Sequence, residues 1–279
     1  MRALLALALS ALLAGCSTQA LLADALAAQG QDEEQDLQLA REASAFYLKL
    51  SESVLREQPG HSALAGAVAG GFTQYAYAFV AFEAERLESQ NLKAALAQRQ
   101  RAEALYARAQ AHALRALEAR QSGFAQALAT GVPTLQADQL GLAYWGAAAW
   151  AARISLAKDR PEIVADLPLA LHLAQAAWQR DPSWGAGDLA SLMGTLEAAR
   201  PGGSAAQAAQ YFERARQLAG GRKAGVFVAQ AEALATQDRD AFESLLRQAL
   251  AVAAQHPNLA NAVMRERAQW LLDTLDERF

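Results

Sequence analysis

The sequence has 279 residues and a formal net charge of −4, from 25 Lys and Arg against 29 Asp and Glu. Basic residues are not in excess, so the composition does not indicate a nucleic acid or an anionic lipid surface as partner. A chain of this length can bury a core that is stable without cross-links, and a single cysteine, Cys16, excludes an internal disulfide.

The amino terminus predicts a lipoprotein signal peptide. Arg2 precedes an apolar run that ends in Leu-Ala-Gly-Cys at Cys16. This tetrapeptide resembles the lipobox of bacterial lipoproteins, which implies cleavage before Cys16 and lipid on its sulfur. Ser17 follows where an inner-membrane retention signal places Asp, so we expect an outer-membrane protein, lipid-anchored on the periplasmic face. The expected organisation is a signal peptide (1–15), a lipidated tether (16–35) and a single helical domain (36–279).

From residue 36 onward the apolar spacing is helical, and Ala, Leu, Gln, Glu and Arg predominate over β-branched residues. We expect an all-α protein of about eleven helices, the first over 36–58. The next, over 62–89, carries an apolar stripe of Phe72, Tyr75, Ala76, Phe79 and Phe82. Asn91 is expected to cap a helix to residue 121. Its predicted buried residues are Leu92, Leu96, Leu105, Leu114 and Leu117, and Arg99, Arg101, Arg108 and Arg115 are expected in solvent.

Residues 140–158, LGLAYWGAAAWAARISLAK, are apolar on every side of a helix until Arg153. Such a helix lies inside a bundle or a membrane. Its apolar character comes mostly from Ala and Gly, and Arg153 and Lys158 fall within it, which disfavours the membrane. We therefore expect the central helix of an all-α domain.

The remaining chain predicts helices whose ends are marked by prolines and capping residues. Pro161 fits a first helical turn, and we expect Ser183, Ser204 and Asp240 to cap later helices. The last helix, from about residue 259, ends on Phe279, whose apolar ring predicts a docked C-terminus.

Three predicted helix ends share a proline, at Pro59, Pro182 and Pro257. Their separations are close to three and two units of about 40 residues, the length of a helix-hairpin repeat. The units do not superpose in sequence. We expect a degenerate array of α-hairpins that resembles tetratricopeptide repeats (TPR).

No motif predicts catalysis, a cofactor or a metal site. The histidines, His61, His112, His172 and His256, are too far apart for two to share a helix turn, so each is expected to be a cap or a surface residue. The pairs Glu52-Ser53, Glu88-Ser89 and Glu243-Ser244 only faintly suggest the acid of a peptidoglycan-cleaving enzyme. The residues favour a non-enzymatic binding or scaffold module.

Several longer blocks resemble one family, in order along nearly the whole chain. They include LKLSESVLREQPGH, GFTQYAYAFVAFEAERLE and RAEALYARAQAHALRALEAR, followed by DPSWGAG and LANAVMRERAQWLLDTLDERF. They resemble the T component, TatT, of tripartite ATP-independent periplasmic (TRAP) transporters. The resemblance implies a TPR-like lipoprotein accessory that binds the periplasmic solute-binding P component. It also implies a homotrimer with a channel through each protomer and a hydrophobic ligand.

If a channel exists, aromatic side chains of the two apolar helices and one cation are the expected lining, because they suit an apolar ligand that carries a carboxylate. These candidates are Tyr75, Tyr77, Tyr144, Trp145, Trp150 and Arg153. Plain core packing is the alternative for each. Two further functions stay open: a generic TPR scaffold of envelope assembly that binds peptide in a groove, and an enzyme that acts on peptidoglycan.

Overall fold

The structure is a computed structural model that describes residues 20–28 and 34–279. In this part of the chain the regular elements are helices and there is no strand, which confirms the all-α prediction. None of its helices is both long and apolar enough to cross a bilayer. The signal peptide and Cys16 lie outside the described residues.

The amino-terminal half begins with a helix over residues 20–28. Asp36, His61 and Asn91 cap the next long helices, because each side chain accepts hydrogen bonds from backbone N–H groups of the first turn. The elements are α2 (Leu37–Glu57), α3 (Ser62–Ala76), the π-helix η1 (Tyr77–Ala81), α4 (Phe82–Leu87), α5 (Leu92–Arg120), α6 (Phe124–Thr130), the 3-10 helix η2 (Ala137–Gln139) and α7 (Leu140–Leu156).

The carboxy-terminal half consists of shorter helices that are separated by tight turns. Ser204 caps α11 as predicted, with its hydroxyl accepting from the Gln207 N–H at 3.2 Å. The elements are α8 (Pro161–Val164), α9 (Leu167–Arg180), η3 (Trp184–Gly187), α10 (Asp188–Ala199), α11 (Ala205–Ala219), α12 (Ala224–Leu234), α13 (Arg239–Gln255), α14 (Leu259–Asp273) and η4 (Leu275–Glu277).

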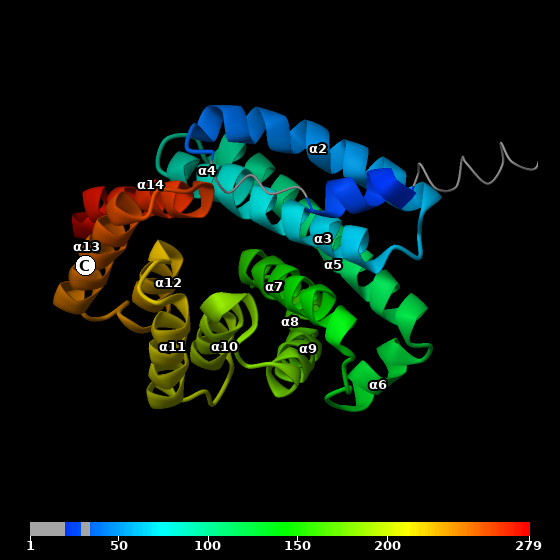
Figure 1. The fold of residues 1–279 in the computed structure, drawn as a ribbon. Coiled ribbons are helices and arrows are strands. Elements are labelled where there is room, and N and C mark those ends of the chain that lie inside the picture. Colours follow the sequence, from blue (N-terminus) through cyan, green and yellow to red (C-terminus); the bar gives the residue numbers. More distant parts are fainter. Residues whose placement is uncertain (1–19, 29–33) are drawn as a thin grey trace, which may run out of the picture.

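Most helices pack against their neighbours in the chain, and the last one returns to the first half. Figure 1 shows the path descending from α3 and α5 through α7 and α9 and returning through α10 to α13. At its end α14 packs against α2. The chain therefore closes on itself, and the contact between α14 and the α2–α4 region is the seam of this closure.

The central position of α7 is confirmed. It packs against α3, α5 and α9, and Leu142, Ala147 and Trp150 are among its buried residues. The prolines that follow α2, α9 and α13 confirm the three predicted helix ends. The TPR-like repeat of these units stays a prediction.

Two predictions about α5 and the C-terminus were only partly right. Leu92 and Leu96 are exposed by 60% and 45%, because α5 buries a face of alanines instead, and small side chains allow a closer helix approach. Leu117 is buried as expected.

The C-terminal residue is partly docked. Phe279 packs edge-on against Phe242, with ring centroids 5.5 Å apart, but remains 43% exposed.

Two predicted caps were wrong. The Ser183 hydroxyl donates to the Asp181 carboxylate at 2.6 Å, and α10 begins only at Asp188, after the left-handed Gly187. Asp238 caps α13 in place of Asp240, since its carboxylate accepts from the Ala241 N–H at 3.0 Å.

Gly187 holds a left-handed turn against a neighbouring backbone. Its φ is 99°, and a Cβ there would lie 2.5 Å from the carbonyl oxygen of Ala215 in α11. We expect Gly187→Ala to lower the free energy of unfolding by about 2–4 kcal/mol, from the left-handed strain and the clash together. Gly123→Ala is the matched control, because φ is 81° and no atom lies near its Cβ position. Urea denaturation should show a loss of only about 1–2 kcal/mol there, and equal losses would contradict the contact argument.

Candidate functional site: an apolar cavity beside the seam

A cavity of about 420 Å³ lies among α2, α3, η1, α7, α14 and the helix over residues 20–28. Within the described part of the chain its lining contains no charged side chain. The polar groups are hydroxyls and one amide, and the rest are apolar or aromatic. The lining is Leu26, Ala27, Ser44, Tyr47, Leu48, Ser51, Ala67, Gly70, Gly71, Gln74, Tyr75, Tyr77, Ala78, Phe79, Trp145, Leu259, Ala260, Val263 and Met264.

A pair of glycines on α3 makes room for this cavity. A Cβ on Gly70 would lie 2.7 Å from the indole of Trp145, and one on Gly71 would meet the end of the Leu48 side chain. The indole therefore lies flush against the α3 backbone. This is the reason a tryptophan of α7 reaches the cavity wall without filling the cavity.

The π-helix η1 supplies Tyr77, Ala78 and Phe79 to the same wall. A π turn inserts an extra residue into the helix and is frequently found at functional sites. The Tyr77 hydroxyl points toward the Met264 sulfur, at 3.9 Å, and burial raises the pKa of Tyr77. This hydroxyl therefore stays neutral and can donate a hydrogen bond.

The helix over residues 20–28 closes one side of the cavity with Leu26 and Ala27. Asp24 fixes it by pairing with Nε2 of His61 at 3.0 Å. Nδ1 of the same ring accepts from the Leu64 N–H and caps α3. The predicted role of His61 as a cap is confirmed, and one imidazole joins the cap to the cavity wall.

The structure divides the six predicted lining residues into two groups. Tyr75, Tyr77 and Trp145 line the cavity. Tyr144 lies behind Trp145, at 4.8 Å between ring centroids, and also contacts Trp184 at 4.4 Å. It forms a second layer of aromatic packing.

Trp150 and Arg153 lie elsewhere on α7. The Trp150 indole donates to the Asp166 carboxylate at 3.3 Å. The Arg153 guanidinium lies 3.7 Å from the Glu103 carboxylate and donates to the Gln110 amide oxygen at 3.4 Å, both on α5. Neither residue is part of the cavity wall, so the wall lacks the cation expected for a carboxylate ligand.

A second cavity of about 640 Å³ shares the wall formed by Tyr75, Ala78, Phe79 and Val263. In contrast to the first cavity, its remaining lining includes charged side chains, namely Arg41, Glu42, Glu83, Arg86 and Glu266. The two spaces therefore adjoin at η1 and the middle of α14. An apolar chamber and a polar chamber meet at the seam.

A buried ion network, which the sequence did not reveal, holds this seam. Arg267 of α14 is only 6% exposed and donates to Glu232 of α12 at 2.6 Å and to Glu85 of α4 at 3.0 Å. Its guanidinium also lies over the rings of Tyr77 and Phe82, at 5.4 and 5.3 Å. One sequence signal existed, since Arg267 falls on the apolar stripe of α14.

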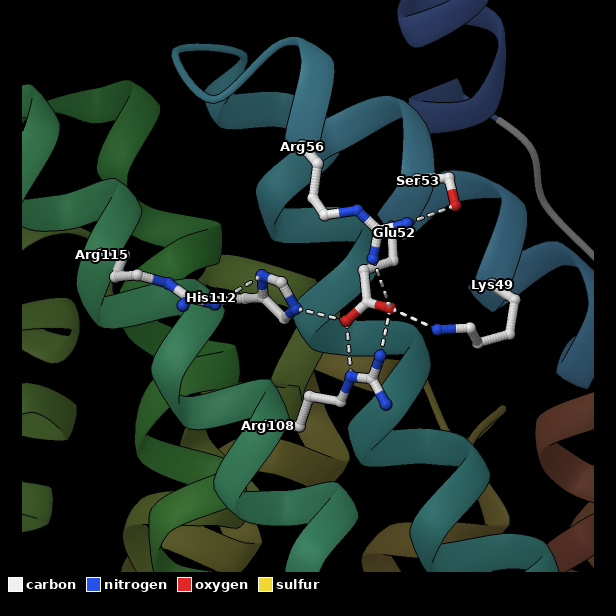
Figure 2. Close-up of polar contacts among 7 residues, drawn as sticks. All are labelled: Lys49, Glu52, Ser53, Arg56, Arg108, His112 and Arg115. Atoms are coloured by element: carbon white, nitrogen blue, oxygen red, sulfur yellow. Dashed lines mark hydrogen bonds and ion pairs between the residues drawn. The ribbon is translucent and has the colours of Figure 1, made fainter.

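A second buried carboxylate, Glu52, joins α2 to α5 (Figure 2). Arg108 donates to both of its oxygens, His112 lies 2.9 Å away and Lys49 lies 2.8 Å away. Burial raises the pKa of Glu52, but the hydrogen bonds from Arg108, Lys49 and His112 outweigh it and lower the pKa to about 2. His112 is therefore buried in this cluster, and its predicted place at a cap or the surface was wrong.

The ionised state of Glu52 bears on the peptidoglycan hypothesis. A general acid for glycosidic cleavage needs a raised pKa, and Glu52 has the opposite shift.

Across residues 20–28 and 34–279, no three His, Cys, Asp or Glu side chains gather to form a metal site.

We expect Glu52→Gln to lower the free energy of unfolding at neutral pH by about 1.5–3 kcal/mol, because Arg108 and His112 lose charge-assisted bonds. The folded pKa of Glu52 is depressed, so its contribution is present above 4.5 and is lost as pH falls toward about 2. The difference between wild type and variant should therefore shrink in acid. Urea titrations at neutral and acidic pH measure this, and a constant difference would contradict the assigned pKa.

Comparison with known proteins places the chain in a family. It is 26% identical over 255 residues to an uncharacterised protein of Treponema pallidum (strain Nichols), covering 86% of this chain and 79% of that protein. The family model of the TRAP transporter T-component matches residues 33–279, which include the seam, the Glu52 cluster and the cavity lining except Leu26 and Ala27. The chain therefore belongs to the TRAP transporter T-component family.

Proposed function

We propose that this protein is a non-enzymatic, periplasm-facing lipoprotein of a TRAP transport system. It binds the solute-binding P component and holds an uncharged, apolar ligand in the cavity beside the seam. Family membership supports the transport role. The single observation that supports the ligand class is the lining, which contains no charged side chain in the described part of the chain.

The lining favours a neutral ligand over the carboxylate that Arg153 suggested. A carboxylate in this cavity would lose its water without gaining a cation, which is strongly unfavourable. The hydroxyls of Tyr47 and Tyr77 and the amide of Gln74 offer hydrogen bonds to a hydroxyl or carbonyl group. The cavity therefore suits an apolar skeleton that carries one or two such groups.

The lipid anchor on Cys16 and the outer-membrane location belong to the same proposal. The helix over residues 20–28 begins four residues after Cys16 and forms part of the cavity wall. An acylated sulfur would place this wall close to the bilayer surface, from which apolar molecules partition. The intact mass of the protein purified from membranes should include the diacylglyceryl group. A full-length chain with a free thiol at Cys16 would contradict the proposed lipid anchor.

The experiment for the transport role is co-purification of the wild-type lipoprotein, extracted in detergent, with the P component encoded in the same organism. A stable complex of the two purified proteins is expected. A generic TPR scaffold would instead leave the P component unbound and retain peptides. Sedimentation velocity of the sample also tests the homotrimer, which is part of this proposal.

A further inference from the structure

Five cations on neighbouring sides of α2 and α5 form a surface that we call the basic face. It consists of Lys49 and Arg56 on α2 and of Arg101, Arg108 and Arg115 on α5. On both helices the cations recur every seven residues, so each set lies on one side of its helix. Figure 2 shows three of them, Lys49, Arg56 and Arg108, around the carboxylate of Glu52, and Arg115 on the other side of His112.

The charge of the basic face is only partly compensated. Glu52 is the carboxylate that pairs with it, and α3, the helix between α2 and α5, has no Asp, Glu, Lys or Arg. The acids of α5 are engaged elsewhere: Glu103 pairs with Arg160, and Glu118 accepts from backbone N–H groups at the start of α6. Glu57 follows Arg56 directly, which turns it about 100° around α2, whereas the exposed Glu42 lies seven residues before Lys49 and shares the side of the cations. The five cations therefore face two acids, Glu42 and Glu52. A chain of net charge −4 thus concentrates positive charge here.

The guanidinium groups of the basic face are held in place. Arg108 is fixed by Glu52 and lies 4.8 Å from the Phe72 ring centroid. Arg101 lies over Tyr75 at 5.9 Å, and Arg115 lies 3.2 Å from the His112 ring. The exposed residues between them on α5, Ala104 and Ala111, are too small to cover them. Because Glu52 already takes Nε and Nη2 of Arg108, Arg56, Arg101 and Arg115 are the guanidinium groups of this face that are available to carboxylates fixed on a folded surface.

An exposed aromatic ring borders the same surface. Phe46 is 66% exposed, precedes Lys49 by one helical turn and packs edge-on against Tyr47, with centroids 5.9 Å apart. Exposed aromatic rings among arginines are the composition of protein–protein hot spots. Tyr47 and Tyr75 line the cavity, so the basic face borders the cavity wall.

We infer that the basic face, with Phe46 as its apolar anchor, is the docking surface for a folded protein that presents an acidic patch. This inference rests on the proposed function, so the docked protein is the solute-binding P component. Four of the five cations are arginines, three of them braced by the protein. Anionic membranes are bound by clusters of Lys or Arg beside several apolar residues, whereas the apolar anchor of the basic face is the single ring of Phe46.

The test is the affinity of the purified P component for wild type and variants, measured by biolayer interferometry at low and moderate salt. Arg56→Glu/Arg115→Glu, in exposed side chains, should weaken binding by about tenfold or more, and Phe46→Ala by about tenfold. The control, Arg180→Glu/Arg214→Glu on α9 and α11, makes the same change in net charge and should stay within about twofold of wild type. Salt should weaken wild type more than the basic-face double variant.

The outcomes separate the inference from the proposed function. If wild type binds the P component and the basic-face double variant binds it equally well, the proposed docking surface is overturned and the transport role is left intact. No binding by wild type would remove the proposed P-component role together with this inference. Co-sedimentation with phosphatidylglycerol vesicles that requires Arg56 and Arg115, without P-component binding, would assign the surface to lipid and also overturn it.

Discussion

Replacement of Arg267 by methionine is expected to lower the free energy of unfolding by about 3–5 kcal/mol, the usual loss when one partner of a buried ion pair is removed. Arg267 is the cation that Glu85 and Glu232 share inside the seam. Methionine fills similar space but leaves both carboxylates without a counter-charge. Urea denaturation followed by circular dichroism measures the loss. The control is Arg265→Met, an exposed position on α14, where a change below about 0.5 kcal/mol is expected.

The pH dependence of the same variant provides a second check. Burial raises the pKa of Glu85 even with Arg267 present, and removal of Arg267 must raise it further. A carboxyl whose folded pKa exceeds its unfolded value stabilises the fold at low pH and loses this contribution as pH rises through the folded pKa. The deficit of Arg267→Met should therefore be smaller near pH 5 than near pH 7.5. A deficit that grows in mild acid would contradict the shared-cation network.

Gly70→Ala is expected to weaken binding of an uncharged apolar probe in the cavity by about tenfold. The new Cβ would occupy the space of the Trp145 indole, which lies 2.7 Å from that position. The indole must then move from the α3 backbone, and the cavity is the open space beside it. Alanine is favourable in a helix by about 0.5–1 kcal/mol, which offsets part of the about 1–3 kcal/mol that displacement of the indole costs, so the loss of stability should stay below about 2 kcal/mol.

The probe for this test is 2-naphthalenemethanol, titrated by isothermal calorimetry, with tryptophan fluorescence as a second readout. Gly60→Ala is the matched control, because no atom lies near its Cβ position in the turn before α3. Unchanged affinity in Gly70→Ala, or an equal loss in both variants, would contradict the assigned role of the glycine.

Much of the fold could be predicted because local signals agreed with the tertiary structure. Asp36, Asn91 and Ser204 cap their helices, and the apolar stripe that begins at Phe72 is largely buried. The prediction failed where a distant partner decided the outcome. Leu92 is exposed because the alanine face of α5 is the one that its neighbours cover. The π turn of η1 has no sequence signal in this chain.

The site was predictable only as a region of the chain. On a helix that is apolar on every side, periodicity does not tell which face borders a cavity. Trp145 borders it because Gly70 lies opposite, whereas Trp150 and Arg153 turn toward other partners. The wall contributed by α14 comes from more than a hundred residues further along the chain. Arg267 was missed because its partners lie on other helices, and Glu52 was missed because Arg108 and His112 lie on α5.

The charge preference of the cavity is the most direct test of the proposed site. It is measured by titrating wild type near pH 7.5 with 2-naphthalenemethanol and with 2-naphthoate, which share a ring system and differ in charge. The lining predicts one site for the alcohol and an affinity for the carboxylate that is weaker by about tenfold or more. Equal or tighter binding of 2-naphthoate at the site that Gly70→Ala blocks would contradict a neutral, apolar ligand.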